Sequence, residues 1–380
     1  MKILHTSDLH IGKRINEYSM LDEQKFILDE IFSIAQTEQP DAVILAGDIY
    51  DKSVPSAEAI TIFDDFLVKL AGLGKAIFII SGNHDSVERL SFASRILEAS
   101  KIYLSPAYDG NISPVILTEG GTEVAFYMLP FIKPSVVQHK AGDAAEIKTY
   151  DDAMRFAISK MYIDKSRRNV LITHQYVTGA ERSESEDFII GGLDNVDASA
   201  FDSFDYVALG HLHRPQFCGR PTIRYSGSPL KYSFSEVNDK KSVTIVEFKA
   251  NEGPIITEHV LKPLHEWYDL RGTYDELTAR NFYDGQGYQE AFVRITLTDE
   301  DDIPDGMRKL KTIYHRLADL HYDNKRTRDG MKLIDRPMNV NKLNPIELFD
   351  ELFEKQNAQH LSDKQNVYLN GLIDQIFNNK

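Results

Sequence analysis

The stretch KILHTSDLH at residues 2–10 decides the fold, together with two later stretches of the same design, AVILAGDIYD at 42–51 and AIFIISGNHD at 76–85. Each begins with a nearly continuous apolar run and then changes abruptly to Asp, Asn or His. A short apolar run of this kind is typical of a β-strand that is covered on both faces. The three stretches therefore predict buried strands with polar groups at their carboxyl ends.

Two further apolar runs, at 170–173 and 206–209, end in the same way, at His174 and in the sequence GHLH at 210–213. Ligands of layered α/β proteins collect outside the carboxyl ends of the strands. We expect the five runs to belong to one sheet and their polar ends to meet in one crevice.

Helices are predicted between the first three strands. Residues 21–38 and 57–73 both place apolar side chains at the three- and four-residue spacing of a helix that packs on one face. Strand–helix–strand alternation implies right-handed crossovers, so the fold class is α/β with layered sheets and helices.

Length and composition restrict the function. The chain has 380 residues, enough for about two domains, and 58 acidic residues against 43 Lys and Arg give a formal charge of −15. Net charge therefore cannot attract nucleic acid, which would need a local basic patch or bound cations. The single cysteine, Cys218, excludes an internal disulfide and a thiolate zinc site. Without a signal peptide or a long apolar run, a cytoplasmic location and no membrane contact are expected.

The pattern changes near residue 258. A first domain at 1–258 is predicted to be followed by a small α+β domain at 259–323, a polar linker at 324–343 and a helical tail at 344–380. The tract 303–336 carries nine Lys or Arg against five Asp, so it is either a solvated face or a phosphate-contacting patch.

The tail is predicted to contain two amphipathic helices, which begin near Asn344 and Ser362 and show capping-box residues. Two helices beyond a linker cannot bury two apolar faces by themselves. They either dock back on the body of the protein or bind a partner as helices in a groove.

The polar side chains at the strand ends form a candidate metal site. Burying so many ionisable groups together is costly unless cations pair with them. The set contains oxygen and imidazole ligands only, which suits Mn, Fe or Zn. We therefore expect two divalent ions held by Asp8, His10, Asp48, Asn83, His174, His211 and His213.

Three residues, one of them already named as a ligand, have predicted roles in the chemistry. Asp48 has two carboxylate oxygens and can bridge both ions, which would share a water and bind a phosphoryl centre between them. His84 is a candidate general acid, with Asp51 setting its tautomer and raising its pKa. Alternatively, His84 is only a hydrogen-bonding residue near the site.

The motif series D-x-H, G-D-x-x-D, G-N-H-D, H and G-H-x-H resembles that of the calcineurin-like metallophosphoesterases over residues 1–230. The stretches SDLHIGK, GDIYDKSVPS and YSGSPLKYSFSE (225–236) extend the resemblance to bacterial nuclease subunits related to the Mre-type DNA repair nucleases. The resemblance implies two β-sheets flanked by helices. It also implies one ion on Asp8, His10, Asp48 and His213, and a second on Asp48, Asn83, His174 and His211.

The same resemblance implies a function. Its members cut DNA with Mn²⁺, as exonucleases on duplex ends and endonucleases on single strands and hairpins, in DNA repair, recombination and replication. They form homodimers and work at the nucleoid with a coiled-coil ATPase of the SbcC type. The tail helices would bind this ATPase, and the second domain would cap the site and steer DNA.

Two other functions remain possible from the residues alone. A phosphatase or cyclic-nucleotide phosphodiesterase that acts on small molecules needs the same metal site, and only the extra domain and tail favour the nuclease. A scaffold without activity usually loses ligands or the catalytic histidine, whereas all of them are present here.

Overall fold

The computed structural model describes residues 1–142, 145–186, 195–249, 252–325, 327–328, 346, 349–350, 352–353 and 360–377. The chain divides into two compact units, one of Met1–Tyr268 with Glu290–Phe292 and one of Asp269–Gln289 with Val293–Lys380. Each unit is described by itself. The predicted limits of the four segments stay a prediction.

The first unit contains a six-stranded sheet in the order β14-β13-β1-β4-β5-β6. Its central strands β1, β4 and β5 are parallel, as strand–helix–strand connections require. The strands are β1 (Lys2–Thr6), β4 (Ala42–Ala46), β5 (Ala76–Ile80), β6 (Ile102–Leu104), β13 (Ser242–Glu247) and β14 (Ile255–Val260).

A second six-stranded sheet has the order β11-β12-β10-β9-β8-β7, and β8, β9, β10 and β12 are parallel neighbours within it. Its strands are β7 (Val115–Glu119), β8 (Thr122–Leu129), β9 (Arg168–His174), β10 (Tyr206–Gly210), β11 (Gln216–Cys218) and β12 (Arg220–Tyr225). The prediction that all five apolar runs share one sheet is wrong, because β9 and β10 belong here. A run that is buried on both faces fits the centre of either sheet, so its pattern could not distinguish them.

The two sheets pack face to face. Side chains from both meet in one core, with Ile44 and Phe78 from the first sheet and Phe126, Ile172 and Ala208 from the second. Alternate residues of the same strands point outward to helices, because side chains alternate in direction along a strand. The α/β sandwich of two sheets flanked by helices is confirmed.

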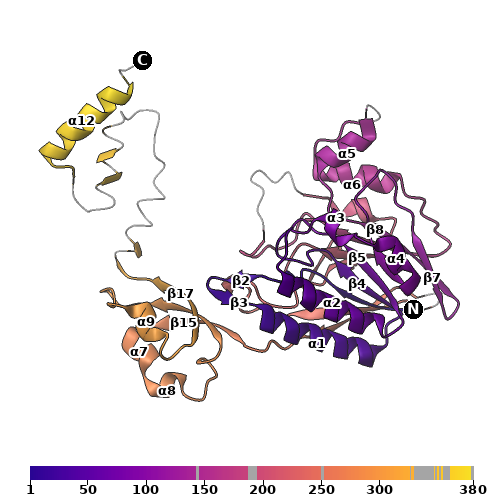
Figure 1. The fold of residues 1–380 in the computed structure, drawn as a ribbon, viewed down its shortest axis with the longest axis horizontal. Helices are drawn as coiled ribbons and strands as arrows, with labels where there is room; N and C mark the ends of the chain where they lie inside the picture. The colour runs from indigo at the N-terminus through magenta and orange to yellow at the C-terminus, as the bar shows by residue number, and fades with distance from the viewer. Residues whose placement is uncertain are drawn as a thin grey trace. The chain divides into compact units, whose positions relative to one another are not determined.

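Helices cover the outer faces. In Figure 1, α1 (Leu21–Glu38) and α2 (Ala57–Ala71) lie side by side along the first sheet. Their bounds agree with the predicted 21–38 and 57–73 to within two residues. The outer face of the second sheet packs against α5 (Pro134–Ala141) and α6 (Tyr150–Ser159) in a second core. Short helices α3 (Val87–Leu90) and α4 (Ser94–Leu97) follow β5.

The described part of the second unit contains most of a three-stranded sheet, β15-β16-β17. The sheet consists of β15 (Trp267–Gly272), β16 (Phe292–Leu297) and β17 (Arg316–Tyr322), with α7 (Tyr274–Thr278), α8 (Arg280–Tyr283) and α9 (Gly306–Leu310). Farther along the chain, α12 spans Asp363–Phe377, and Gln365 accepts the Ser362 N–H at 2.9 Å as the capping pattern predicts. Of the first predicted tail helix, residues 346, 349–350 and 352–353 are described and are helical. Its predicted start at Asn344 and most of the linker lie outside the described residues.

Within the described ranges, no helix has the length and apolar character needed to cross a membrane.

Candidate metal centre

The structure brings the predicted ligands together at the carboxyl ends of β1, β4, β5, β9 and β10. Ligand atoms lie within 4.8 Å of one another in three overlapping groups, which are Asp8–His10–His213, His10–Asp48–His84 and Asp8–Asp48–His174. Asn83 joins them because its Oδ1 contacts both His174 and His211 at hydrogen-bond distance. The polar side chains therefore meet as expected, at the ends of strands that belong to two facing sheets.

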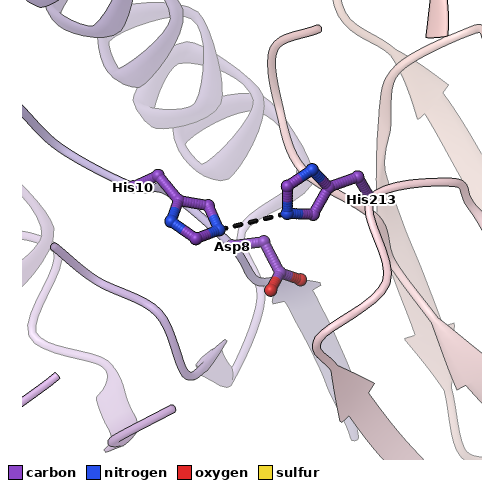
Figure 2. A group of neighbouring side chains, drawn as sticks. All are labelled: Asp8, His10 and His213. Atoms are coloured by element: carbon purple, nitrogen blue, oxygen red, sulfur yellow. Dashed lines mark hydrogen bonds between the residues drawn. The ribbon is translucent and has the colours of Figure 1, made fainter. Parts of the chain in front are cut away.

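One half of the site, here called the first half, consists of Asp8, His10 and His213. The Nε2 atoms of His10 and His213 lie 3.1 Å apart, and Figure 2 shows the two rings facing each other beside the Asp8 carboxylate. All three side chains are buried. Two imidazole nitrogens at this separation match neighbouring ligands of a single ion.

The other half, here called the second half, consists of Asn83, His174 and His211. Asn83 Oδ1 lies 3.0 Å from His174 Nε2 and 3.0 Å from His211 Nδ1. The His174 Nδ1–H donates to the Ala46 carbonyl at 2.9 Å, which directs Nε2 into the site.

Asp48 lies between the halves. Its Oδ2 is 3.6 Å from His10 Nε2 in the first half and 3.2 Å from His174 Nε2 in the second. Its Oδ1 accepts the backbone N–H of His84 at 2.9 Å. This is the position that a bridging carboxylate requires.

The donor atoms fit a cation. With its Nδ1 proton donated to Ala46, a neutral His174 presents a lone pair at Nε2, and this lone pair faces the lone pairs of Asn83 Oδ1 and Asp48 Oδ2. Such an arrangement is stable only with a proton or a metal ion among the three atoms. The absence of sulfur among them favours a hard or borderline divalent ion.

The backbone at the site is strained. Asp8, His10, Asp48 and His211 all have positive φ angles, of 54°, 43°, 48° and 108°. Residues with a Cβ rarely adopt this region, and its cost of about 1–3 kcal/mol each must be met by surrounding interactions. Four of the seven candidate ligands therefore lie on backbone of this kind.

Two glycines permit the close approach of the strand ends. A Cβ on Gly210 would lie 1.9 Å from the Ala46 carbonyl oxygen and 2.7 Å from His174 Nδ1. A Cβ on Gly82 would lie 2.1 Å from Asp48 Oδ1. Both positions therefore exclude a larger residue, which gives a physical reason for Gly in the G-N-H-D and G-H-x-H motifs.

Burial and neighbouring charges shift the pKa values of the candidate ligand side chains. Burial raises the pKa of Asp8 to about 6, against the opposing influence of His174 and His213. For His174, burial alone would lower the pKa, but the Asp48 carboxylate outweighs it and raises the pKa to about 9. Burial and the charge on His174 lower the pKa of His211 to about 3. Positive charge is thus favoured beside Asp48, where a divalent ion would supply it.

His84 lies at the edge of this cluster, and its ring is 4.8 Å from that of His10 in an edge-to-face arrangement. Its Nδ1 hydrogen-bonds with the backbone carbonyl of Asp51 at 3.0 Å. The carboxylate of Asp51 instead pairs with Lys13 Nζ at 2.9 Å. Asp51 therefore contacts His84 through its main chain, a distinction that the side-chain pattern of a sequence cannot reveal.

Sequence reasoning missed two residues that hold the site loops. Asp85 is the last letter of G-N-H-D, and its carboxylate accepts N–H groups from Ile49, Tyr50 and Gly82 at 2.9–3.1 Å. This joins the loops after β4 and β5. Gln24 on α1 donates to the His10 carbonyl at 2.7 Å and accepts the Gly12 N–H at 2.9 Å. The motif could have suggested Asp85, but nothing in the helix pattern distinguished Gln24.

A buried charged pair behind His213 was also missed. Glu236 Oε2 and Lys241 Nζ are 2.5 Å apart, and both side chains are almost wholly excluded from solvent. Burial by itself raises the pKa of Glu236, but Lys241 and His213 outweigh it and hold the pKa well below its usual range. Glu236 ends the stretch YSGSPLKYSFSE, which the sequence singled out without giving it a role.

Basic residues of the tract 303–336 are partly neutralised where they are described. Arg308 pairs with Asp305 at 2.9 Å and Arg328 with Asp323 at 2.6 Å. These pairs favour a solvated face for that part of the tract. Its residues 329–336 lie outside the described ranges.

Comparison with known families agrees with this geometry. The model of the calcineurin-like phosphoesterase family matches residues 1–215, more than half of the chain. A second model, the type 5 capsule protein repressor C-terminal domain, matches residues 260–357. The chain therefore belongs to the calcineurin-like phosphoesterases, a class of metal-dependent hydrolases of phosphate esters.

Full-length relatives narrow the assignment. The SbcD component of the nuclease SbcCD from Staphylococcus epidermidis is 34% identical over 99% of both chains, and that from Staphylococcus saprophyticus is 33% identical over 96% of both. Within the phosphoesterase class, the chain belongs to the SbcD family of nuclease subunits. A dimetal phosphatase from Danio rerio aligns with 68% of this chain and 95% of its own at 11% identity, with a TM-score of 0.41, too low to support an argument.

Proposed function

We propose that this chain is the nuclease subunit of an SbcCD-type complex and hydrolyses DNA phosphodiester bonds with two divalent ions, Mn²⁺ in preference to others. One observation carries the proposal. Seven oxygen and nitrogen ligands from five strand ends converge, and Asp48 lies between their two halves. A shared carboxylate between two ligand sets is what a two-ion phosphoesterase requires.

We assign one ion to each half of the site, with Asp48 as a ligand of both. Asp8, His10, Asp48 and His213 would hold the first ion, and Asp48, Asn83, His174 and His211 the second. Such a pair of ions lowers the pKa of a shared water and stabilises the attacking and leaving oxygens. Oxygen and imidazole ligands without thiolate suit Mn²⁺.

His84 would donate the proton that the leaving oxygen needs. The Asp51 carbonyl keeps a proton on Nδ1, so the proton that is transferred comes from Nε2. The Asp48 carboxylate accepts the His84 backbone N–H and so fixes this residue beside the bridging ligand.

DNA is the proposed substrate because the two staphylococcal relatives are named nucleases. We propose 3′–5′ exonuclease activity on duplex ends and endonuclease activity on single strands and hairpins, in DNA repair, recombination and replication in the cytoplasm at the nucleoid. The formal charge of −15 opposes DNA binding, and the two ions would offset it locally.

An SbcC-type coiled-coil ATPase is the proposed partner, and it would control cleavage through the tail. On α12, Val367 and Tyr368 are 73% and 71% exposed. Apolar side chains this exposed on an amphipathic helix suit binding in a groove. The small α+β domain would cap the site and steer DNA.

A homodimer is proposed through α2 and the short helices α3 and α4. Ile60, Phe92 and Ile96 are 48%, 80% and 75% exposed. Ile60 and Phe92 line a hollow of about 610 Å³, as does Leu97, the residue that follows Ile96. Exposed apolar side chains that cluster in this way mark an interaction surface. Replacing Phe92 and Ile96 by Glu should give monomers in light scattering, and an unchanged dimer would place the interface elsewhere.

The activity is tested with metal-free protein, a DNA hairpin and nitrophenyl phosphate. We expect Mn²⁺ to restore hairpin cleavage far more than ester hydrolysis, and His84→Ala to lower cleavage by about 10²–10⁴-fold with both ions still bound. Ester hydrolysis without DNA cleavage, even with the ATPase added, would indicate a small-molecule phosphatase.

The tail is tested separately. Deleting residues 343–380 should abolish co-purification with the ATPase but leave Mn²⁺-dependent cleavage of single strands. A truncated chain that still binds the ATPase would refute the assignment of the tail.

A further inference from the structure

Each polar group of His213 except the ring nitrogen Nε2 contacts a residue outside the set of candidate ligands. Its backbone N–H donates to Glu186 Oε1 at 2.6 Å, and its carbonyl accepts from Lys241 Nζ at 2.8 Å. Its ring Nδ1 lies 2.7 Å from Ser185 Oγ. Nε2 remains, 3.1 Å from His10 Nε2.

Ser185 Oγ contacts Ser183 Oγ at 2.8 Å as well as His213 Nδ1, and its contact with Glu236 decides the direction of these hydrogen bonds. Ser185 Oγ lies 2.5 Å from Glu236 Oε1, and a carboxylate can only accept. Glu236 is kept ionised by Lys241, whose ammonium lies 2.5 Å from the other oxygen. The one hydroxyl proton of Ser185 therefore goes to Glu236, and the Ser185 oxygen must accept a proton from His213 Nδ1.

A proton fixed on Nδ1 leaves the lone pair on Nε2. We infer that Ser185, Glu236 and Lys241 form a relay that selects the metal-binding tautomer of His213 and so positions it as a ligand of the first ion. The inference deepens the proposed function and rests on it. The relay passes through a hydroxyl, because Glu236 Oε1 itself lies 3.6 Å from His213 Nδ1, too far for a direct hydrogen bond. Many metal-binding histidines instead contact a carboxylate directly, and the residues of this relay are positioning residues.

A purely structural role for the charged pair would give a different outcome. Buried ion pairs often contribute little net stability, because desolvation offsets their attraction. A pair kept only for packing would not need Ser185, whose hydroxyl is the group that connects the carboxylate to the imidazole. Removing that hydroxyl therefore separates the two roles without creating an unpaired buried charge.

The chain offers a matched control. Ser233 Oγ also contacts Glu236 Oε1, at 3.2 Å, but it makes no contact with His213 among the hydrogen bonds of the described residues. Ser185→Ala and Ser233→Ala thus each delete one hydroxyl beside the same carboxylate. Ser185→Thr keeps the hydroxyl and should retain the relay.

The experiment is a calorimetric titration of Mn²⁺ into the metal-free full-length chain, with thermal unfolding measured in parallel. We expect Ser185→Ala to weaken the binding of one of two ions by about 10–100-fold, with the other ion unaffected. Ser233→Ala and Ser185→Thr should bind both ions like the parent. Unfolding temperatures of the metal-free variants should stay together.

The outcomes separate the relay from the proposed function. Equal losses in Ser185→Ala and Ser233→Ala, or no loss in either, would overturn the relay and leave the metal site standing. A parent chain that binds no Mn²⁺ would overturn both. A parent that binds two ions without cutting DNA would refute only the proposed substrate, and the relay would still be judged by the titrations.

Discussion

The two halves of the metal centre are held by different means. In the first half, side chains from distant segments hold the ligands, because Gln24 holds the His10 carbonyl and Ser185 holds the His213 ring. In the second half, the main chain does most of this, since the Ala46 carbonyl holds His174 and the fit depends on Gly210.

This difference determines how each half of the metal centre should respond to amino-acid substitutions. A ligand held by side chains can be displaced by a single substitution that leaves the strands intact. A ligand held by the closeness of two strands cannot move unless the sheets move, and close-packed interiors resist such movement. Substitutions in the first half should therefore act mainly on metal affinity, and substitutions in the second half mainly on the stability of the fold.

Asp48 belongs to both halves, so its removal should give the largest effect. Asp48→Asn keeps the shape but removes the shared charge between His10 and His174. We expect weak binding of both ions and a fall in cleavage of about 10⁴-fold, equal to about 5.5 kcal/mol of barrier. Calorimetry and a cleavage assay measure the two quantities. Retention of one ion at full affinity would show that Asp48 does not bridge.

Gly210→Ala tests the main-chain half. The added methyl would meet the Ala46 oxygen at 1.9 Å, so the strand ends of the two sheets must separate. We expect a loss of about 3 kcal/mol in the free energy of unfolding, measured in urea with metal-free protein. Gly253→Ala is the control, because nothing lies within 4 Å of its added methyl. Similar stability in the two variants would show that the sheets can yield at this edge.

The sequence predicted which seven side chains come together, because each lies at the end of a strand or within a few residues after it. A strand followed by Asp, Asn or His gives the direction of the chain as well as the position of the side chain, so all seven candidate ligands could be named. Two sheets could not be recognised from these runs, since β9 and β10 have the same buried pattern as β1. The resemblance to a known family supplied that fact.

The supporting contacts could not be predicted for a different reason. Gln24 reaches the His10 carbonyl from α1, and Glu236 reaches Ser185 from a short 3-10 helix, Phe234–Glu236. Both depend on tertiary packing and carry no local periodicity. Likewise, a sequence pattern cannot show that Asp51 faces His84 with its carbonyl.

Gln24→Leu tests the side-chain half at a site away from the Ser185 relay. It removes the donor to the His10 carbonyl and the acceptor for the Gly12 N–H, both in the loop that carries His10. We expect about tenfold weaker binding of one Mn²⁺ and a loss of about 1–2 kcal/mol in the free energy of unfolding. If both ions weaken equally in the titration, the two halves are not independent.

The smallest effect is expected at Asp51. Asp51→Asn keeps the main-chain carbonyl that contacts His84 Nδ1 and removes only the charge that pairs with Lys13. Since exposed or partly exposed pairs contribute about 1 kcal/mol or less, we expect cleavage to fall less than about tenfold. Single-turnover cleavage with saturating Mn²⁺ measures this, with His84→Ala beside it for scale.

A large fall in the cleavage rate of the Asp51→Asn variant would change the interpretation of the Asp51 side chain. If cleavage fell as far as in His84→Ala while both ions stayed bound, the Asp51 carboxylate would itself have to act on His84. The carboxylate lies 3.8 Å from His10 Nδ1, so weaker binding of one ion would instead indicate that it orients that ligand. Measuring Mn²⁺ affinity and the single-turnover rate on the same variant distinguishes a proton-transfer role from a ligand-positioning role.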